Sequence, residues 1–246
     1  MAAVGDVHLG PDTAGRLRPV LEHIPQCADV LLLAGDLTRC GTAAEAEAAA
    51  AEFADLGVPV LAVLGNHDHH SEAADEVAGI FGRRGIRMLE GQAEVLDLGG
   101  IRLGVAGAKG FGGGFAGRCG SAFGEREMKA FIQHTEYSAE LLHSALQAAS
   151  DSDVDVLVAL THYAPVPDTL RGEPLEIYPF LGSYQLAEAI DAAGADLAVH
   201  GHAHAGSERG TTPGGVAVRN VAQPVIESAY AVYRVPSGRL SAASVP

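Results

Sequence analysis

Polar side chains of the kinds that bind metal ions follow five short apolar runs along the chain. Each run of three to five apolar residues ends, and Asp, Asn or His stands within the next few positions. The five segments are Gly5-Asp6-Val7-His8, Gly35-Asp36, Gly65-Asn66-His67-Asp68, Thr161-His162 and Gly201-His202-Ala203-His204. Carboxylate, carboxamide and imidazole groups together suit borderline divalent ions such as Mn, Fe, Co, Ni or Zn. The pattern therefore indicates metal chemistry.

The apolar runs that precede these segments predict buried strands. Continuous runs of this length are typical of strands covered on both faces by helices or a second sheet. Helices are predicted between them over residues 42–57, 71–81, 125–150 and 183–193, and Thr42 and Glu45 have the spacing of a capping box. Alternation of strands and helices favours an α/β fold with parallel pairing.

The middle and the end of the chain predict a second, partly antiparallel sheet. Residues 93–98 and 101–106 flank Gly99-Gly100, the pattern of a hairpin with a two-glycine turn. Residues 216–222 and 229–235 predict further strands. Because no linker-like stretch interrupts the chain, we expect one domain over residues 1–246.

The predicted strand ends bring the candidate ligands together. In open α/β sheets, ligands bind beyond the carboxyl ends of the strands, so five such loops can share one crevice. Taken singly, each Asp or Asn could be a turn residue and His162 a buried histidine. Taken together, the side chains are too many for one tetrahedral ion and suit two ions about 3.5–4 Å apart with one bridging carboxylate. The seven candidates are Asp6, His8, Asp36, Asn66, His162, His202 and His204.

In order and rough spacing, the five segments resemble the blocks of calcineurin-like metallophosphoesterases, and the resemblance extends from Ala2 to about Asn220. It implies a four-layer α/β/β/α sandwich of two mixed sheets flanked by helices. It also implies a phosphoester hydrolase in which a water or hydroxide that bridges two divalent ions attacks phosphorus. Manganese is the favoured ion. The implied ligands are Asp6, His8 and His204 for one ion, Asn66, His162 and His202 for the other, and Asp36 as the bridge.

The resemblance also implies two catalytic residues that do not bind metal. His67 would stabilise the transition state and protonate the leaving oxygen, and Asp68 would orient and charge its imidazole. The neighbouring His200 is expected to end its strand as a buried structural residue. His69 and His70 are expected to be exposed loop residues.

The substrate class is predicted more coarsely. The sequence Gly35-Asp36-Leu37-Thr38 is similar to the corresponding motif of small bacterial phosphoesterases of the cyclic-nucleotide phosphodiesterase type. Diesters are therefore favoured over monoesters as substrates. Arg39 is the basic residue nearest the motifs. Two segments, 109–124 and 164–180, could close over the metals and select the substrate. The first contains Lys109 but lacks the Lys-Ser/Thr pair of a phosphate-binding P-loop.

Composition excludes several other functions. The net charge of −15 over 246 residues argues against general nucleic-acid binding, which needs a basic face. The chain shows no secretory signal, and no apolar run reaches the ~18 residues of a membrane span, so we expect a cytoplasmic protein with a small phosphoester substrate and no membrane partner. The three cysteines form no disulfide or zinc pattern and are expected to be small buried residues.

Two alternatives use the same residues differently. The chain could be a catalytically inactive scaffold of this fold that binds protein partners, although such relatives typically lose ligands, and every ligand is present here. It could also be a hydrolase of another metal fold built around His200, His202 and His204. That alternative expects a further Asp-His pair after the cluster, where the chain has Ala205-Gly206.

Overall fold

Two β-sheets pack face to face in the computed structural model, which describes residues 1–235. The first sheet has the strand order β13-β1-β2-β3-β4 and the second has the order β11-β12-β10-β9-β6-β5. Strands of the first sheet are β1 (Ala2–Val4), β2 (Leu31–Ala34), β3 (Val60–Val63), β4 (Arg87–Met88) and β13 (Ala231–Val232). Strands of the second are β5 (Gln92–Asp97), β6 (Arg102–Ala108), β9 (Val156–Thr161), β10 (Leu197–His200), β11 (Arg209–Thr211) and β12 (Ala217–Asn220).

Both sheets are mixed, and parallel pairs form the centre of each. Strands β1 to β4 are parallel, as are β12, β10, β9 and β6, whereas β13, β11 and β5 pair antiparallel at the edges. The predicted hairpin is β5–β6, with Asp97 opposite Arg102. The prediction for residues 229–235 is partly wrong, because only Ala231–Val232 forms a strand and it joins the first sheet.

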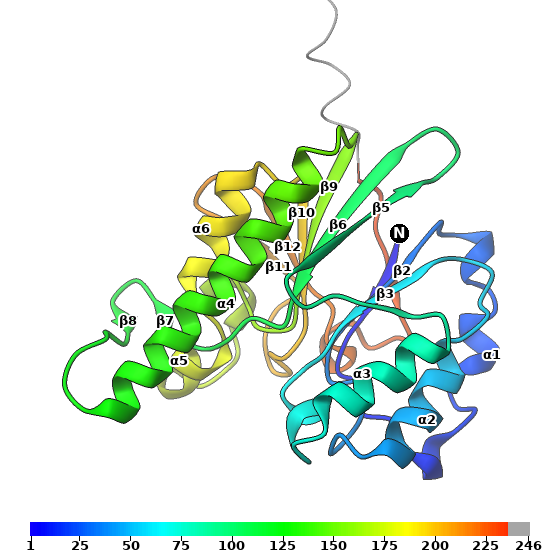
Figure 1. Cartoon of the computed structure of the whole chain (residues 1–246), viewed down its shortest axis with the longest axis horizontal. Helices are drawn as coiled ribbons and strands as arrows, with labels where there is room; N and C mark the ends of the chain where they lie inside the picture. The colour runs from blue at the N-terminus through cyan, green and yellow to red at the C-terminus, as the bar shows by residue number, and fades with distance from the viewer. Residues whose placement is uncertain (236–246) are drawn as a thin grey trace, which may run out of the picture.

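Helices cover the outer face of each sheet (Figure 1). On one side lie α2 (Ala43–Phe53) and α3 (Ala74–Arg83), and on the other lie α4 (Arg126–Ser150) and α6 (Tyr184–Ala193). Helix α2 begins with the predicted capping box between Thr42 and Glu45, and α6 ends at Gly194, whose φ of 63° suits glycine. The short elements are α1 (Arg18–Leu21), α5 (Tyr178–Leu181), α7 (Gln223–Ile226) and the hairpin β7 (Gly114–Phe115) to β8 (Arg118–Cys119).

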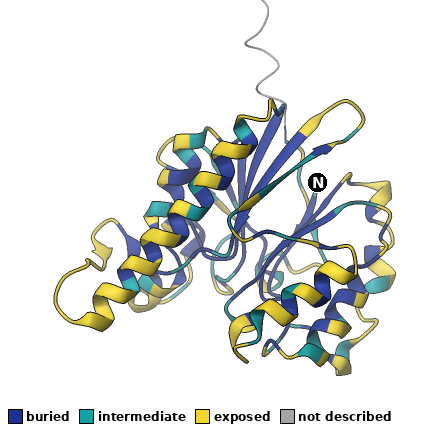
Figure 2. Ribbon diagram, viewed as in Figure 1, coloured by how far each residue is buried: buried dark blue, intermediate teal, exposed yellow. Residues whose placement is uncertain are grey.

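The apolar side chains divide among the layers. Between the sheets, residues such as Leu32 and Leu61 from the first pack with Val105, Val158 and Val199 from the second, and all five are fully buried. Two further clusters fill the spaces between each sheet and its helices, and Figure 2 shows buried strands enclosed by helices whose outer faces are exposed. The predicted four-layer sandwich is therefore confirmed, and its parallel strands point their carboxyl ends toward one edge.

Some local predictions need correction. The helix predicted to reach Gly57 ends at Phe53, and the one predicted from Ser71 begins at Ala74. All three cysteines are exposed and free, because they lie in surface turns and in the β7–β8 hairpin rather than in the buried strands of the two large sheets. Residues 236–246 of the predicted single domain lie outside the described residues. Within residues 1–235, no helix is both long and apolar enough to cross a membrane.

Candidate metal centre

The predicted ligands come together at the carboxyl edge of the two sheets. They follow β1, β2 and β3 of the first sheet and β9 and β10 of the second. Two groups of donor atoms form there, and within each group the atoms lie within 4.8 Å of one another. One group is Asp6, His8, Asp36 and His204, and the other is Asp36, His162 and His202.

Asp36 belongs to both groups, and its two oxygens face different ones. Its Oδ2 lies 3.9 Å from Nε2 of His8, and its Oδ1 lies 3.4 Å from Nε2 of His162. The carboxylate is buried and presents one oxygen to each side. This is the arrangement that a carboxylate shared by two cations requires.

Asn66 completes the second group. Nδ1 of His162 lies 2.8 Å from the carbonyl oxygen of Ala34, which can only accept, so Nδ1 carries the proton and Nε2 carries a lone pair. That lone pair faces Oδ1 of Asn66 at 2.9 Å as well as Oδ1 of Asp36. These three oxygen and nitrogen atoms lie close together and are ligands of the kinds that suit a borderline divalent cation.

Asp6 ties the first sheet to the loop after β10. Its Oδ1 lies 2.8 Å from Nε2 of His204, and its Oδ2 accepts the backbone N–H of His202 at 2.9 Å. Nε2 of His202 donates to the carbonyl of Phe180 at 3.3 Å, which leaves Nδ1 with the lone pair. Strands distant in the sequence are thus held together by the same residues that supply metal donors.

The backbone at the centre is strained. Four candidate ligands, Asp6, His8, Asp36 and His202, have φ values of 56°, 43°, 51° and 70°. This left-handed region is uncommon for residues other than glycine, and such conformations cluster at functional sites. Close packing adds a second constraint, because a Cβ at Gly65 would collide with the Asp36 carboxylate. The backbone of these loops therefore adopts strained conformations that direct the candidate ligands toward the centre.

The electrostatics of the centre also fit divalent cations. Burial lowers the pKa of His162 well below its ordinary value and lowers the pKa of His202 to about 3, so both rings are neutral and keep their lone pairs at neutral pH. Burial raises the pKa of Asp6 to about 6, against the lowering effect of its hydrogen bond with His204. A cation would favour the ionised carboxylate and offset this cost of burial. The donor set therefore suits two divalent ions that share Asp36.

Comparison with known proteins decides the family. The model of the calcineurin-like phosphoesterase family matches residues 1–206. The chain belongs to the calcineurin-like phosphoesterase family. This family uses a dinuclear divalent metal centre and hydrolyses phosphoesters, which agrees with the two donor groups. No curated protein matches the sequence.

Solved structures show the same fold at low sequence identity. Phosphopantetheinyl hydrolase from Mycobacterium tuberculosis is 15% identical, with a TM-score of 0.61 over 92% of this chain and 89% of that one. A putative 5′-nucleotidase from Staphylococcus aureus is 16% identical, with a TM-score of 0.56 over 89% of this chain and 47% of that one. GAP50, the anchor in the inner membrane complex of Plasmodium, is 13% identical, with a TM-score of 0.56 over 91% and 71%.

His67 lies beside this phosphoesterase centre without joining either donor group. Its ring centroid is 4.6 Å from that of His8, and its Nε2 is 4.0 Å from Oδ2 of Asp36. Its Nδ1 lies 2.7 Å from the backbone oxygen of Arg39 and so carries a proton. The exposed ring therefore directs Nε2 toward the open side of the centre.

The contact expected between Asp68 and the His67 ring is wrong. Asp68 is fully buried, and its oxygens accept the backbone N–H groups of Leu37 (3.2 Å), Thr38 (2.8 Å) and Gly65 (2.8 Å) and the Thr38 hydroxyl (2.6 Å). Among the hydrogen bonds of residues 1–235, none joins Asp68 to the His67 ring. The 3₁₀ helix His67–His69 turns Asp68 inward, where it connects the loops after β2 and β3.

Other residues near the centre have structural partners. His200 is buried, with Nδ1 2.7 Å from the carbonyl of Gly201 and Nε2 2.8 Å from the Thr169 hydroxyl, as its expected structural role requires. The Arg39 side chain bonds Asp12 and the backbone oxygen of His8. The carbonyls of Arg39 and Phe180 that position His67 and His202 were missed by the sequence analysis, because a backbone carbonyl leaves no signal in side-chain type.

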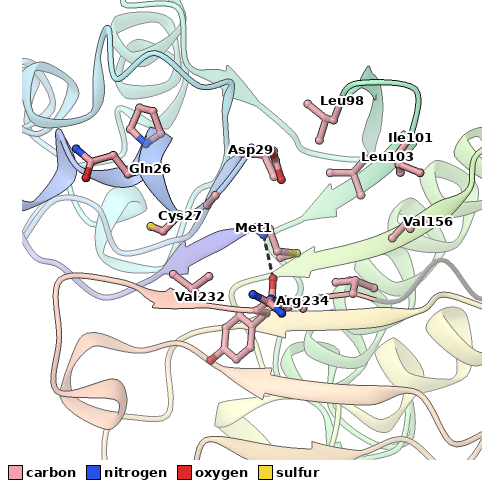
Figure 3. A pocket seen from close by; sticks show the side chains of 15 residues that line it. Met1, Gln26, Cys27, Asp29, Leu98, Ile101, Leu103, Val156, Val232 and Arg234 are labelled. Atoms are coloured by element: carbon pink, nitrogen blue, oxygen red, sulfur yellow. Dashed lines mark hydrogen bonds between the residues drawn. The ribbon is translucent and has the colours of Figure 1, made fainter.

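A separate cavity lies at the opposite edge of the sheets. Its volume is about 1070 Å³, and Figure 3 shows residues that line it, which are mainly apolar and lie around the amino ends of the strands. Its lining includes Met1, Val30, Leu103, Val156 and Val232, and it contains none of the predicted ligands. This cavity therefore does not coincide with the candidate metal centre, whose donor atoms lie at the other edge.

Proposed function

We propose that this protein hydrolyses small phosphoesters at a dinuclear metal centre, with diesters favoured over monoesters. The observation that carries the proposal is the shared carboxylate of Asp36, which faces one donor group with each oxygen. A site for a single ion would leave one of these two donor groups without a bound ion. The name of the Staphylococcus aureus neighbour, a putative 5′-nucleotidase, supports small phosphoesters as the substrate class.

The ions would be held by side chains that the fold already places close together. Asp6, His8 and His204 would hold one, Asn66, His162 and His202 the other, and Asp36 both. When bound, two divalent ions supply Lewis acidity that lowers the pKa of water and offsets the charge of the phosphoryl group. The protein contributes neutral imidazoles, buried carboxylates and loops fixed by Asp68, so the donors need little rearrangement.

His67 would supply the proton for the leaving group. Its Nδ1 proton is held by the Arg39 carbonyl, so Nε2 is the nitrogen that can exchange a proton with the substrate. With both ring nitrogens protonated, His67 would give its Nε2 proton to the alkoxide that forms as the phosphorus–oxygen bond breaks, and would keep the Nδ1 proton as a neutral imidazole. Asp68 would act indirectly, by fixing the loop that carries the Arg39 carbonyl.

The test is hydrolysis by metal-stripped protein titrated with Mn²⁺, Ni²⁺, Zn²⁺ and Fe²⁺. Bis-p-nitrophenyl phosphate reports diester hydrolysis and p-nitrophenyl phosphate reports monoester hydrolysis. We expect metal-restored turnover, with the diester hydrolysed faster. Folded protein that binds two ions but hydrolyses neither substrate would indicate a narrower substrate. Folded protein that binds no ions would favour the inactive scaffold instead.

Three finer parts of the proposal rest on the sequence alone. Manganese is the favoured ion, with Fe, Zn, Ni and Co as the alternatives. The protein is proposed to be cytoplasmic and to bind neither nucleic acid in general nor membranes. Reconstitution with each ion, and fractionation of the source cells, would test these points.

A further inference from the structure

A sixth strand end, not assigned by the motifs, also reaches the metal centre. Lys109 directly follows β6, which pairs with β9 so that Ala108 lies opposite Thr161. The backbone oxygen of Lys109 accepts the N–H groups of His162 at 3.0 Å and Tyr163 at 3.1 Å. Lys109 is therefore fixed beside His162, one of the candidate metal ligands.

Within residues 1–235, the ammonium group of Lys109 forms no ion pair with a carboxylate. It lies over the rings of Phe111 and Tyr163, with Nζ 5.3 and 5.2 Å from their centroids, and it donates to the carbonyl of Gly110 at 3.3 Å. Glu90 bonds the backbone N–H of Lys109 rather than its ammonium. An ammonium without an ion-pair partner can bind an anionic ligand.

The same ammonium shares a neighbour, Tyr163, with the metal donors. The Tyr163 ring that it covers is 4.4 Å, centroid to centroid, from the ring of His202. Burial lowers the pKa of Lys109, and the carboxylates of Glu90 and Asp36 raise it, so the shared carboxylate of the centre is within electrostatic reach. A phosphoryl group held at the centre would therefore lie in the field of this cation.

Substrate charge distinguishes the two classes of phosphoester. A diester phosphoryl group carries one negative charge, whereas a monoester carries nearly two at pH 8, because its second pKa is about 6. A lysine ammonium is a compact point charge on a flexible stem and binds such oxygens readily. In a protein of net charge −15, a lysine near the centre adds local positive charge that favours a dianion over a monoanion.

We propose that Lys109 binds the additional negatively charged oxygen of a phosphomonoester and so determines how well this centre accepts monoesters. The inference rests on the proposed phosphoesterase function. Diester hydrolysis depends on the metal ligands and His67, and monoester hydrolysis depends on Lys109 as well.

The chain offers a matched control, because Lys109 and Lys129 are its only lysines and Lys129 is exposed on α4. The Lys109→Met variant keeps the length of the stem and removes the charge. With the same p-nitrophenolate leaving group, we expect kcat/KM to fall about 10- to 100-fold for the monoester and less than about threefold for the diester. Lys109→Arg should recover part of the monoester activity, and Lys129→Met should behave as wild type.

Two results would overturn the inference while leaving the proposed function intact. One is an equal loss on both substrates, which would mean that Lys109 only supports His162 and Tyr163. The other is unchanged activity on both. Thermal unfolding of each variant would show whether packing survives the substitution.

Binding of inorganic phosphate at pH 8, followed by calorimetry on metal-loaded protein, separates this inference from the proposed function. If wild type hydrolyses neither substrate, the two hydrolysis assays cannot report on Lys109, and phosphate binding by metal-loaded protein still decides its role. Wild-type affinity at least tenfold above that of Lys109→Met supports the anion site. Equal affinity, or no detectable binding by wild type, overturns it.

Discussion

Replacing Asp68 by Asn separates a structural role for this carboxylate from the catalytic role expected from sequence. Asn keeps one oxygen, which can still accept from the Thr38 N–H and hydroxyl. Its amide nitrogen would replace the oxygen that accepts from Leu37 and Gly65, so two buried N–H groups would face a donor. Burial raises the pKa of Asp68 to about 6, so at pH 8 the wild-type carboxylate is ionised and accepts all four bonds.

The cost follows from those two lost acceptors. A buried donor without a partner costs about 1–3 kcal/mol, so two cost roughly 2–6 kcal/mol of unfolding free energy. In a chain of this size each kcal/mol lowers Tm by ~2–4 °C, so we expect a decrease of roughly 5–20 °C. Asp55→Asn is the control, because Asp55 is exposed with a φ of 52° that Asn tolerates, and its effect should stay within about 0.5 kcal/mol.

Thermal and urea unfolding at pH 8 in EDTA would measure this cost without a contribution from metal binding. The basic limb of the pH–rate profile should keep its position in the Asp68→Asn enzyme, because Asp68 does not touch the His67 ring. A variant of wild-type stability with a displaced pH–rate profile would refute the reasoning. That result would indicate that Asp68 acts directly on the His67 ring.

Three further predictions follow from the site. His67→Ala should keep both ions and lose about 10²–10⁴-fold in turnover, most on poor leaving groups; equal loss on good and poor leaving groups would count against a proton donor. Asn66→Ala should weaken one ion selectively in calorimetric titration, and equal weakening of both would contradict the division of ligands. Burial lowers the pKa of His200 to about 4, so wild type loses stability as pH falls from about 6.5 to 4. The urea-measured stability advantage of wild type over His200→Gln should therefore shrink by about 2 kcal/mol between pH 7 and pH 5, and a constant difference would contradict it.

Much of the architecture could be predicted because strand burial and ligand type leave direct signals. Runs such as Val156–Leu160 are apolar throughout since both faces of the sheet are covered, and their ends place His162 and its counterparts at one edge. Parallel pairing then converts separation in sequence into proximity in space. This reasoning gave an α/β fold with a second sheet and the set of side chains that the structure brings together, whereas the four-layer sandwich was implied by the resemblance to the family.

The errors have physical causes as well. Asp68 stands next to His67 in sequence, but one residue along a 3₁₀ helix points in a different direction, toward the backbone of Leu37 and Thr38. The sequence indicated for Lys109 only a segment that could close over the metals, whereas the structure shows its backbone oxygen bonded to the N–H group of His162. Cysteine composition alone cannot show exposure, and the surface position of Cys119 depends on the β7–β8 hairpin. Such contacts depend on backbone direction, which single-residue patterns do not encode.

The most direct test of the central claim is a titration of metal-stripped protein with Mn²⁺, in which bound ion and diester hydrolysis are measured together for wild type and Asp36→Asn. We predict that wild-type activity reaches its plateau at two ions per chain, and that Asp36→Asn, which removes one of the two shared oxygens, loses tight binding of the pair together with turnover. Full activity at one ion per chain, or an Asp36→Asn variant that retains two tightly bound ions, would contradict a centre built around this shared carboxylate.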